Sequence, residues 1–166
     1  NVYEVIDAAA TKNFGFMAFY PGPGVGGHCI PLDPYYLAWK SKEYDMHTRF
    51  IELAGEINEN MPYFVMSKLQ RVLNQRGRCL KGSSILVLGV TYKADIADPR
   101  ESPATKVMEL LQNEGANLQY SDPYAPSLVV EGREYKSQEV NAELLQRSAC
   151  ALILTAHSVF DYQLVV

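Results

Sequence analysis

The sequence has few cysteines, no long apolar run and no concentration of basic residues. Its three cysteines, Cys29, Cys79 and Cys150, are odd in number and far apart, which argues against a disulfide framework and against a metal site with paired ligands. No window reaches the roughly 18 consecutive apolar residues of a membrane helix, and no signal peptide opens the chain, so we expect a cytoplasmic protein without a membrane partner. The net charge of −4 forms no basic stripe, which argues against nucleic-acid binding and favours a small-molecule ligand.

Composition and length indicate a folded globular chain of modest size. Hydrophobic residues make up 48% and charged residues 20%, which is close to the average for folded domains. With 166 residues there is room for one ordinary domain, or for one small domain with an added helical region. The first ten residues are typical of an amphipathic helix that lacks a start signal, and the closing FDYQLVV lacks the strand that should follow it. We therefore expect the protein to continue beyond both ends.

Residues 1–81 are predicted to form a mainly helical region. Glycine, proline and aromatic residues crowd residues 11–29, so neither a helix nor a regular strand can persist there. Asp33 and Pro34 mark a helix start, with the aspartate as cap and the proline at the first helical position, and the pattern continues to Tyr44.

A long helix is predicted over residues 47–75, where apolar residues recur at helical spacing. Pro62 lies inside this segment and should cause a kink or a short break about one turn before it. The apolar stripe between Phe50 and Leu69 exceeds what a small neighbouring domain can cover. It therefore predicts a homodimer that forms through this helix.

Residues 82–166 are predicted to form an incomplete α/β domain with a Rossmann-like parallel sheet. The apolar run SSILVLGV at 83–90 is long enough for one buried parallel strand. Two helix-and-strand pairs follow, with helices at 103–114 and 139–147 and strands at 117–122 and 149–155. This alternation indicates parallel strands joined by right-handed crossovers.

The segment YPGPGVGGHCIPLD, from Tyr20 to Asp33, carries the strongest chemical signal. Its glycines let backbone N–H groups approach a phosphate or a sugar closely; they are Gly22, Gly24, Gly26 and Gly27. Cys29 ends this loop just before a helix start, where the helix dipole favours a thiolate. Alternatively, Cys29 is a small buried hydrophobic residue beside a structural loop, and composition alone does not decide between the two roles.

The longer segment YPGPGVGGHCIPLDPYYLAWK resembles the active-site segment of the UDP-glucose/GDP-mannose dehydrogenase superfamily. The family's Gly-Gly-x-Cys-x-x-x-Asp pattern falls here on Cys29, as nucleophile, and on Asp33, as a nearby acid. GVTYKADIADPRESPA resembles the opening of the family's nucleotide-binding carboxy-terminal domain, and SDPYAP resembles its next strand end, so the resemblance covers essentially the whole chain. His28 stands where UDP-glucose enzymes generally have serine, which is similar to the branch that oxidises UDP-N-acetylhexosamines.

The resemblance implies an NAD-dependent enzyme that oxidises the C6 alcohol of the sugar to a carboxylate in two steps. Cys29 would add to the aldehyde and then carry the oxidised sugar as a thioester, which water cleaves. Asp33 would assist proton movement, with a helix cap as its alternative role. The substrate expected first is UDP-N-acetylglucosamine, with UDP-N-acetylmannosamine and UDP-glucose as alternatives.

Further site residues follow from the resemblance alone. Lys93 would lie near the nucleotide-sugar, and its alternative role is a solvated surface lysine. Arg100 would contact the NAD phosphates, and its alternative is a salt bridge with Glu101 or Asp98. Aromatic contact and backbone donors would line the nucleotide-sugar at Tyr20, Gly22, Gly24, Gly26 and Gly27, unless these glycines only shape a turn.

The family's amino-terminal Rossmann domain, with its G-x-G-x-x-G loop and upstream catalytic residues, has no counterpart in this sequence. We therefore expect residues 1–166 alone to lack dehydrogenase activity. A non-catalytic nucleotide-binding or dimerisation module is the alternative to an enzyme, and the intact Cys29 and Asp33 favour the enzyme.

Overall fold

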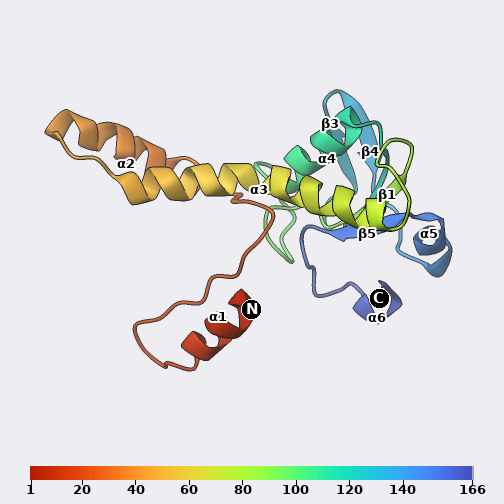
Figure 1. Ribbon diagram of the computed structural model, residues 1–166, viewed down its shortest axis with the longest axis horizontal. Helices are drawn as coiled ribbons and strands as arrows, with labels where there is room; N and C mark the ends of the chain where they lie inside the picture. Colours follow the sequence, from red (N-terminus) through yellow and green to blue (C-terminus); the bar gives the residue numbers. More distant parts are fainter. Residues whose placement is uncertain (166) are drawn as a thin grey trace.

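A parallel three-stranded sheet forms the centre of the carboxy-terminal half of the chain (Figure 1). The computed structural model describes residues 1–165. The strands are β1 (Ser84–Leu88), β2 (Asn117–Ser121) and β5 (Cys150–Ile153), and their order in the sheet is β2-β1-β5. β1 pairs in parallel with both neighbours, so the predicted parallel α/β architecture is confirmed.

The central strand β1 is covered on both faces. Ile85 and Val87 pack into the larger of two apolar cores, whereas Leu86 and Leu88 pack into a smaller one with Leu144. Helices α3 (Arg49–Gln75) and α4 (Pro103–Asn113) close the larger core, and α5 (Ala142–Arg147) closes the smaller. Because successive strand side chains point to opposite faces, a strand covered on both sides is apolar throughout.

Helix α3 connects the two predicted regions. Its carboxy-terminal half buries Met66, Leu69 and Leu73 in the larger core. Its amino-terminal half projects beyond the sheet beside α2 (Asp33–Ser41), which a short 3-10 turn, Lys42–Tyr44, extends (Figure 1). The division into a helical region, residues 1–81, and an α/β domain, residues 82–166, therefore remains a proposal, because α3 packs in the core of the α/β domain.

Of the kink or short break predicted near Pro62, the break is absent, because α3 runs through this residue as one helix. Proline has no N–H, so the carbonyl of Asn58, four residues earlier, loses its usual helical partner. The helix nevertheless continues on both sides of Pro62, which is itself buried. The glycine-rich loop, residues 20–29, lies close to the affected carbonyl, since a Cβ added to Gly24 would be 3.3 Å from Asn58 O.

Two helices begin differently from the prediction. α2 begins at Asp33, with Leu32 as its N-cap residue, so Asp33 is inside the first turn and Pro34 is the second helical residue. The predicted capping role of Asp33 is therefore wrong. α1 (Val2–Ala10) does have a start signal, because the Asn1 side chain accepts a hydrogen bond from the Tyr3 N–H at 3.1 Å.

An antiparallel hairpin that the sequence analysis did not predict lies beside β2. Its strands are β3 (Ser127–Val130) and β4 (Arg133–Lys136). The two-residue turn between them consists of Glu131 and Gly132, both with positive φ, which suits the right-handed twist of a hairpin. A short α6 (Tyr162–Val165) follows β5.

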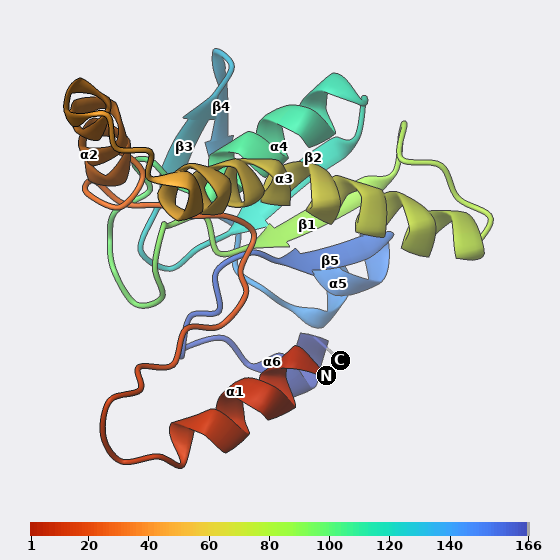
Figure 2. The ribbon, with the colours of Figure 1, turned by 60° about the vertical axis from the view of Figure 1, so that its left-hand side comes forward.

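Helix α1 stands apart from the sheet at the end of an extended segment in both views (Figures 1 and 2). It buries no residue. Tyr3 links it to the glycine-rich loop through a 3.4 Å hydrogen bond from its hydroxyl to Pro21 O. No helix within residues 1–165 is long and apolar enough to cross a membrane.

The buried face of α3 provides a test of this packing. Leu73 is 2% exposed and its neighbour Val72 is 43% exposed. We expect Leu73→Ala to lower the free energy of unfolding by about 2–5 kcal/mol, because it leaves a cavity in the core. Val72→Ala should change it by less than about 0.5 kcal/mol. Urea unfolding of both variants checks this, and equal losses would contradict the assigned faces of the helix.

Candidate functional site

The glycine-rich loop is packed tightly against the second region of the chain at Gly26. A Cβ on Gly26 would lie 2.7 Å from Glu101 O, 2.8 Å from Pro103 Cδ and 2.9 Å from Tyr92 Cβ. The next residue, Gly27, donates its backbone N–H to Glu101 O at 3.1 Å. Only glycine allows this approach, because each distance is shorter than real Cβ contacts. The loop that carries Cys29 is thus fixed on residues 92–103.

A cluster of three charged or ionisable side chains strengthens the same contact. His28 Nε2 lies 3.0 Å from Asp98 Oδ2, and Arg100 donates to both oxygens of Asp98 from Nε and Nη2, at 2.9 Å each. The pKa of the Asp98 carboxyl is held well below its ordinary value, mainly by the bond from Arg100 and then by that from His28. Asp98 therefore stays charged at neutral pH and joins the cysteine loop to Arg100. The salt bridge between Arg100 and Asp98, the alternative to the cofactor role of Arg100, is present.

Cys29 is exposed at the end of the loop. Its carbonyl accepts hydrogen bonds from the N–H groups of Leu32 and Asp33, at 3.0 and 2.8 Å, so the cysteine opens the turn that leads into α2. The alternative of a buried, inert cysteine does not fit this exposure. Asp33 lies one turn further along, in the first turn of α2.

Tyr20 and Gly22 occupy the outer part of the loop, near α1. The Tyr20 hydroxyl donates to Asp7 Oδ1 at 2.8 Å, and this bond raises the pKa of the phenol. Its ring stacks on Tyr3, with centroids 6.1 Å apart. The nearest atom to a Cβ on Gly22 would be Gly24 O, at 3.9 Å, so this glycine faces open space. Gly24 and Gly26, in contrast, pack against protein atoms.

Lys93 and Arg100 lie on the long connection between β1 and α4, and both side chains are exposed. The structure thus brings Arg100 together with the cysteine loop through Asp98. No hydrogen bond or ion pair joins the Lys93 side chain to that loop within residues 1–165. Its backbone is instead fixed by Thr91, whose hydroxyl donates to Lys93 O at 3.0 Å.

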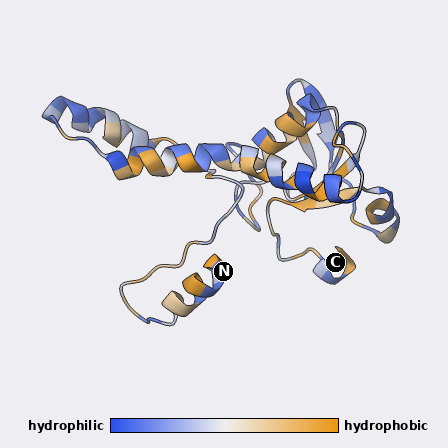
Figure 3. Ribbon diagram, viewed as in Figure 1, coloured by the Kyte–Doolittle hydropathy of each residue, from blue (hydrophilic) through white to orange (hydrophobic). Residues whose placement is uncertain are grey.

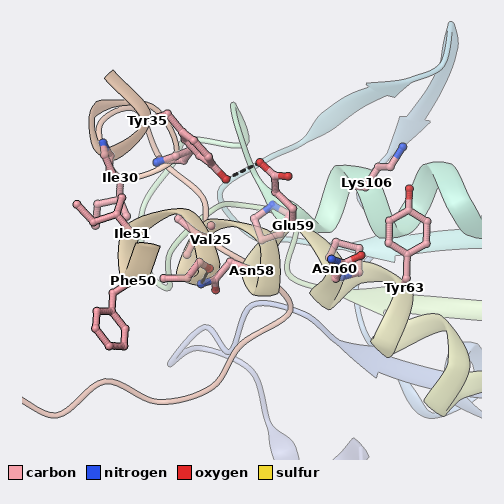
Figure 4. A pocket seen from close by; sticks show the side chains of 17 residues that line it. Val25, Ile30, Tyr35, Phe50, Ile51, Asn58, Glu59, Asn60, Tyr63 and Lys106 are labelled. Atoms are coloured by element: carbon pink, nitrogen blue, oxygen red, sulfur yellow. Dashed lines mark hydrogen bonds between the residues drawn. The ribbon is translucent and has the colours of Figure 1, made fainter. Parts of the chain in front are cut away.

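An apolar groove of about 760 Å³ lies between α2, α3 and the glycine-rich loop (Figure 4). Val25, Ile30 and Phe50 contribute to its walls. Across it, the Tyr35 hydroxyl donates to Glu59 Oε1 at 2.7 Å, and this bond raises the pKa of the phenol. Cys29 is not among the lining residues, so the groove lies beside the thiol and does not contain it.

A buried polar network at the carboxyl ends of β1, β2 and β5 was not predicted. It centres on Asp122 and His157, both fully buried side chains. Asp122 follows β2 in the SDP segment, and that position was its only sequence signal. His157 belongs to no recognised motif. In residues 1–165, no three His, Cys, Asp or Glu side chains are grouped as metal ligands.

The fold and the loop together define a class: a Rossmann-like α/β protein with a helical extension that presents an exposed thiol. Residues 86–165 match the UDP-binding domain of the UDP-glucose/GDP-mannose dehydrogenase family, and residues 1–60 match the central domain of that family. The chain belongs to this family of nucleotide-sugar dehydrogenases.

Individual relatives agree with this assignment. A UDP-N-acetyl-D-mannosamine dehydrogenase of Methanococcus maripaludis is 35% identical over 160 residues, which are 96% of this chain and 34% of that protein. A UDP-N-acetyl-D-glucosamine 6-dehydrogenase of Salmonella typhi is 34% identical over 132 residues, which are 80% of this chain and 31% of that protein. The structure of UDP-D-ManNAc dehydrogenase from Pyrococcus horikoshii superposes with a TM-score of 0.80 at 30% identity, over 99% of this chain and 37% of that one. The chain thus spans about a third of the length of these relatives.

The tight contact at Gly26 can be tested against a matched glycine. Gly26→Ala should lower the thermal unfolding temperature and expose the loop to limited proteolysis, because the new methyl group displaces Glu101 O or Pro103. Gly22→Ala, where a Cβ meets nothing closer than 3.9 Å, should leave both properties unchanged. If the two variants behave alike, the loop is not fixed by this contact.

Proposed function

We propose that this chain is part of a longer nucleotide-sugar 6-dehydrogenase, which oxidises the C6 alcohol of a UDP-N-acetylhexosamine to the uronic acid through a thioester on Cys29. The observation that carries the proposal is the placement of one exposed thiol on a glycine-rich loop fixed against the connection that bears Lys93 and Arg100. Membership of the dehydrogenase family supports the reaction class.

Cys29 supplies the covalent chemistry. Its thiolate adds to the C6 aldehyde carbon, forming a carbon–sulfur bond, and the aldehyde oxygen takes up a proton to give a thiohemiacetal. Oxidation of that carbon leaves a thioester. Water then attacks the thioester carbon, the carbon–sulfur bond breaks, and the carboxylate and the free thiol are released. Asp33, one turn away in the chain, assists proton transfer to or from the attacking water.

Arg100 suits a cofactor phosphate. Asp98 holds its guanidinium through Nε and Nη2, while the Arg100 side chain is 74% exposed, so a fixed cationic group faces solvent beside the cysteine loop. NAD⁺, when bound, would accept the two hydrides that the four-electron oxidation releases. Without the family's amino-terminal domain, residues 1–166 would lack the means to place the nicotinamide, and we propose that they are inactive alone.

The nucleotide-sugar is proposed to contact Tyr20, Gly22 and Lys93. The aromatic ring of Tyr20 and the open backbone at Gly22 support direct contact with the ligand. Gly24, Gly26 and Gly27 act mainly by shaping the loop and packing it in place, because they lie against protein atoms.

The sugar is proposed to be an N-acetylhexosamine, because His28 is similar to that branch of the family, and UDP-N-acetylglucosamine is the first candidate. Relatives of this chain are named for both N-acetylmannosamine and N-acetylglucosamine, so the family relationship supports the class and not one epimer. Turnover of the full-length protein with both compounds and with UDP-glucose separates the three substrates. We place the reaction in the cytoplasm, where cysteines stay reduced, because Cys29 must be a free thiol.

A non-catalytic nucleotide-binding module is the second candidate. Tight packing of the glycine-rich loop would serve either role, so it does not distinguish them. Exposure of Cys29 favours the enzyme, because a cysteine retained only for packing would be buried.

The enzyme is further proposed to form a homodimer through α3. Exposed apolar residues of this helix form a stripe at heptad-like spacing, in which Phe50 is 88% exposed; the other members are Leu53, Ile57 and Phe64. Figure 3 shows apolar residues along the part of α3 that projects beyond the sheet. So large an apolar surface on a helix is typical of an interaction site. A two-fold contact would cover this stripe on both subunits with one pair of helices.

Substitution of Cys29 tests the proposed chemistry. In the full-length enzyme, Cys29→Ser should lower carboxylate production at least about a thousandfold, because the hydroxyl keeps the shape but is a far weaker nucleophile. UDP-sugar affinity should stay within about threefold of wild type, or about 0.7 kcal/mol. Cys79→Ser, at a second exposed cysteine, is the matched control and should retain wild-type turnover. Wild-type carboxylate production by Cys29→Ser would exclude a thioester on this residue.

Light scattering of the full-length protein tests the dimer. We expect a dimeric mass for the wild type and a shift toward the monomer in Ile57→Asp, because a carboxylate would be buried in the apolar contact. Gln70→Asp adds the same charge at an exposed position of α3 outside the stripe and should remain dimeric. A monomeric wild type at high concentration would contradict the proposal.

A further inference from the structure

His157, in the segment that follows β5, is a fully buried histidine with both ring nitrogens hydrogen-bonded. The reaction proposed above makes no use of it. Nδ1 lies 2.9 Å from the backbone nitrogen of Asp95, and Nε2 lies 2.9 Å from Asp122 Oδ2 and 3.2 Å from Thr91 Oγ1. A histidine that only fills the core would not need hydrogen bonds to the connection between β1 and α4, which is more than 60 residues away in sequence.

These partners determine which nitrogen carries the proton. The Asp95 backbone N–H can only donate, so Nδ1 must be the acceptor and is unprotonated. Nε2 therefore carries the ring proton and donates it mainly to the Asp122 carboxylate. Thr91 is consistent with this, because its hydroxyl proton is directed to Lys93 O and its lone pair remains for Nε2. His157 is thus a neutral imidazole in the Nε2–H form.

The Asp122 carboxylate is itself rigidly held. Its Oδ2 accepts backbone N–H bonds from Val90 and Thr91, at 2.7 and 3.2 Å, and its Oδ1 accepts from Tyr124 and Ala125, at 2.8 and 3.1 Å. With its own side chain fully buried, Asp122 gives His157 a fixed acceptor. Asp122, which follows β2, therefore fixes the orientation of the His157 imidazole.

Further hydrogen bonds of the network converge on the five-residue segment Thr91–Asp95, with Lys93 at its centre. Thr155 Oγ1 donates to Thr91 O at 2.6 Å on one side of Lys93. On the other side, Asp95 donates its N–H to His157 and accepts from the Ser158 N–H at 2.9 Å. Asp95 also has a positive φ of 61°, which needs such support. The segment after β5 thus holds the backbone by hydrogen bonds on both sides of Lys93.

We propose that His157 is a positioning residue, which acts through the Asp95 N–H to hold the Thr91–Asp95 segment in the conformation that presents Lys93 to the UDP moiety of the substrate. The inference rests on the proposed function of Lys93. It adds a role for a residue that touches neither the sugar nor the thiol. The essential feature is the acceptor at Nδ1, because that nitrogen alone bonds to the far side of Lys93.

Two substitutions separate the functions of the two ring nitrogens in the full-length enzyme. His157→Asn places an amide oxygen near the Nδ1 position and keeps an acceptor for Asp95 N–H, whereas His157→Gln places an amide nitrogen near the Nε2 position and keeps the donor to Asp122. Both should lower the thermal unfolding temperature. We expect the KM for the UDP-sugar and the Kd for UDP to rise about tenfold in the Gln variant only, with kcat less affected. Equal rises in both variants, in proportion to their loss of stability, would overturn the proposal.

Hydrogen exchange and a double substitution test whether His157 acts on UDP binding through the Asp95 N–H and Lys93. Exchange at the Asp95 amide should accelerate in the Gln variant and not in the Asn variant. Once Lys93→Ala has weakened UDP binding, adding His157→Gln should weaken it little further; a full additional tenfold loss would show that His157 does not act through Lys93. If Lys93→Ala leaves UDP binding unchanged, this positioning role is overturned, while the Cys29 chemistry stands or falls on its own substitution. Should the Gln variant not fold, ¹⁵N spectra of wild-type His157 still decide: any form other than neutral Nε2–H at neutral pH contradicts the inference.

Discussion

Close contact between the glycine-rich loop and residues 92–103 determines where the thiol lies. Gly26 has no room for a side chain against Glu101, and the Gly27 N–H is bonded to the same residue. Cys29 is only two residues further along the chain, so its position follows from this contact. The contact in turn needs both partners folded, because it joins segments more than 60 residues apart in sequence.

Helix α3 provides the support for this contact. Its second half is part of the α/β core, while its first half carries α2 and the turn that begins at Cys29. Pro62 lies near the change between the two halves, where the freed carbonyl of Asn58 faces Gly24. A residue that sequence analysis interprets as a helix breaker is therefore accommodated where the loop meets the helix. The Asp98 carboxylate adds a polar link between the loop and Arg100.

Regular elements were predictable where one strong periodicity governed them. The apolar run of β1 and the helical spacing of α3 and α4 led to correct elements, because burial on known faces dictates those patterns. The β3–β4 hairpin was missed because its strands have four residues each and its Glu131-Gly132 turn is a weak signal. The cap of α2 was misassigned because Asp33 has the residue type of a cap, whereas the turn from Cys29 starts the helix one residue earlier.

The site was only partly predictable, because local sequence patterns reveal continuous segments and not contacts between distant residues. Cys29 and its glycines form one continuous segment, so local sequence was enough to identify them. Pairs such as His28 with Asp98, or His157 with Asp122, join residues 70 and 35 positions apart, and nothing in a single sequence relates them. The most direct test of the account is mass spectrometry of the full-length enzyme, rapidly quenched in acid during turnover of a UDP-N-acetylhexosamine. The account predicts a peptide in which Cys29 carries the oxidised UDP-sugar as a thioester. The Asp33→Asn variant should make hydrolysis rate-limiting, so that this adduct accumulates in the steady state. Absence of the adduct in that variant, under conditions that preserve thioesters, would contradict the account.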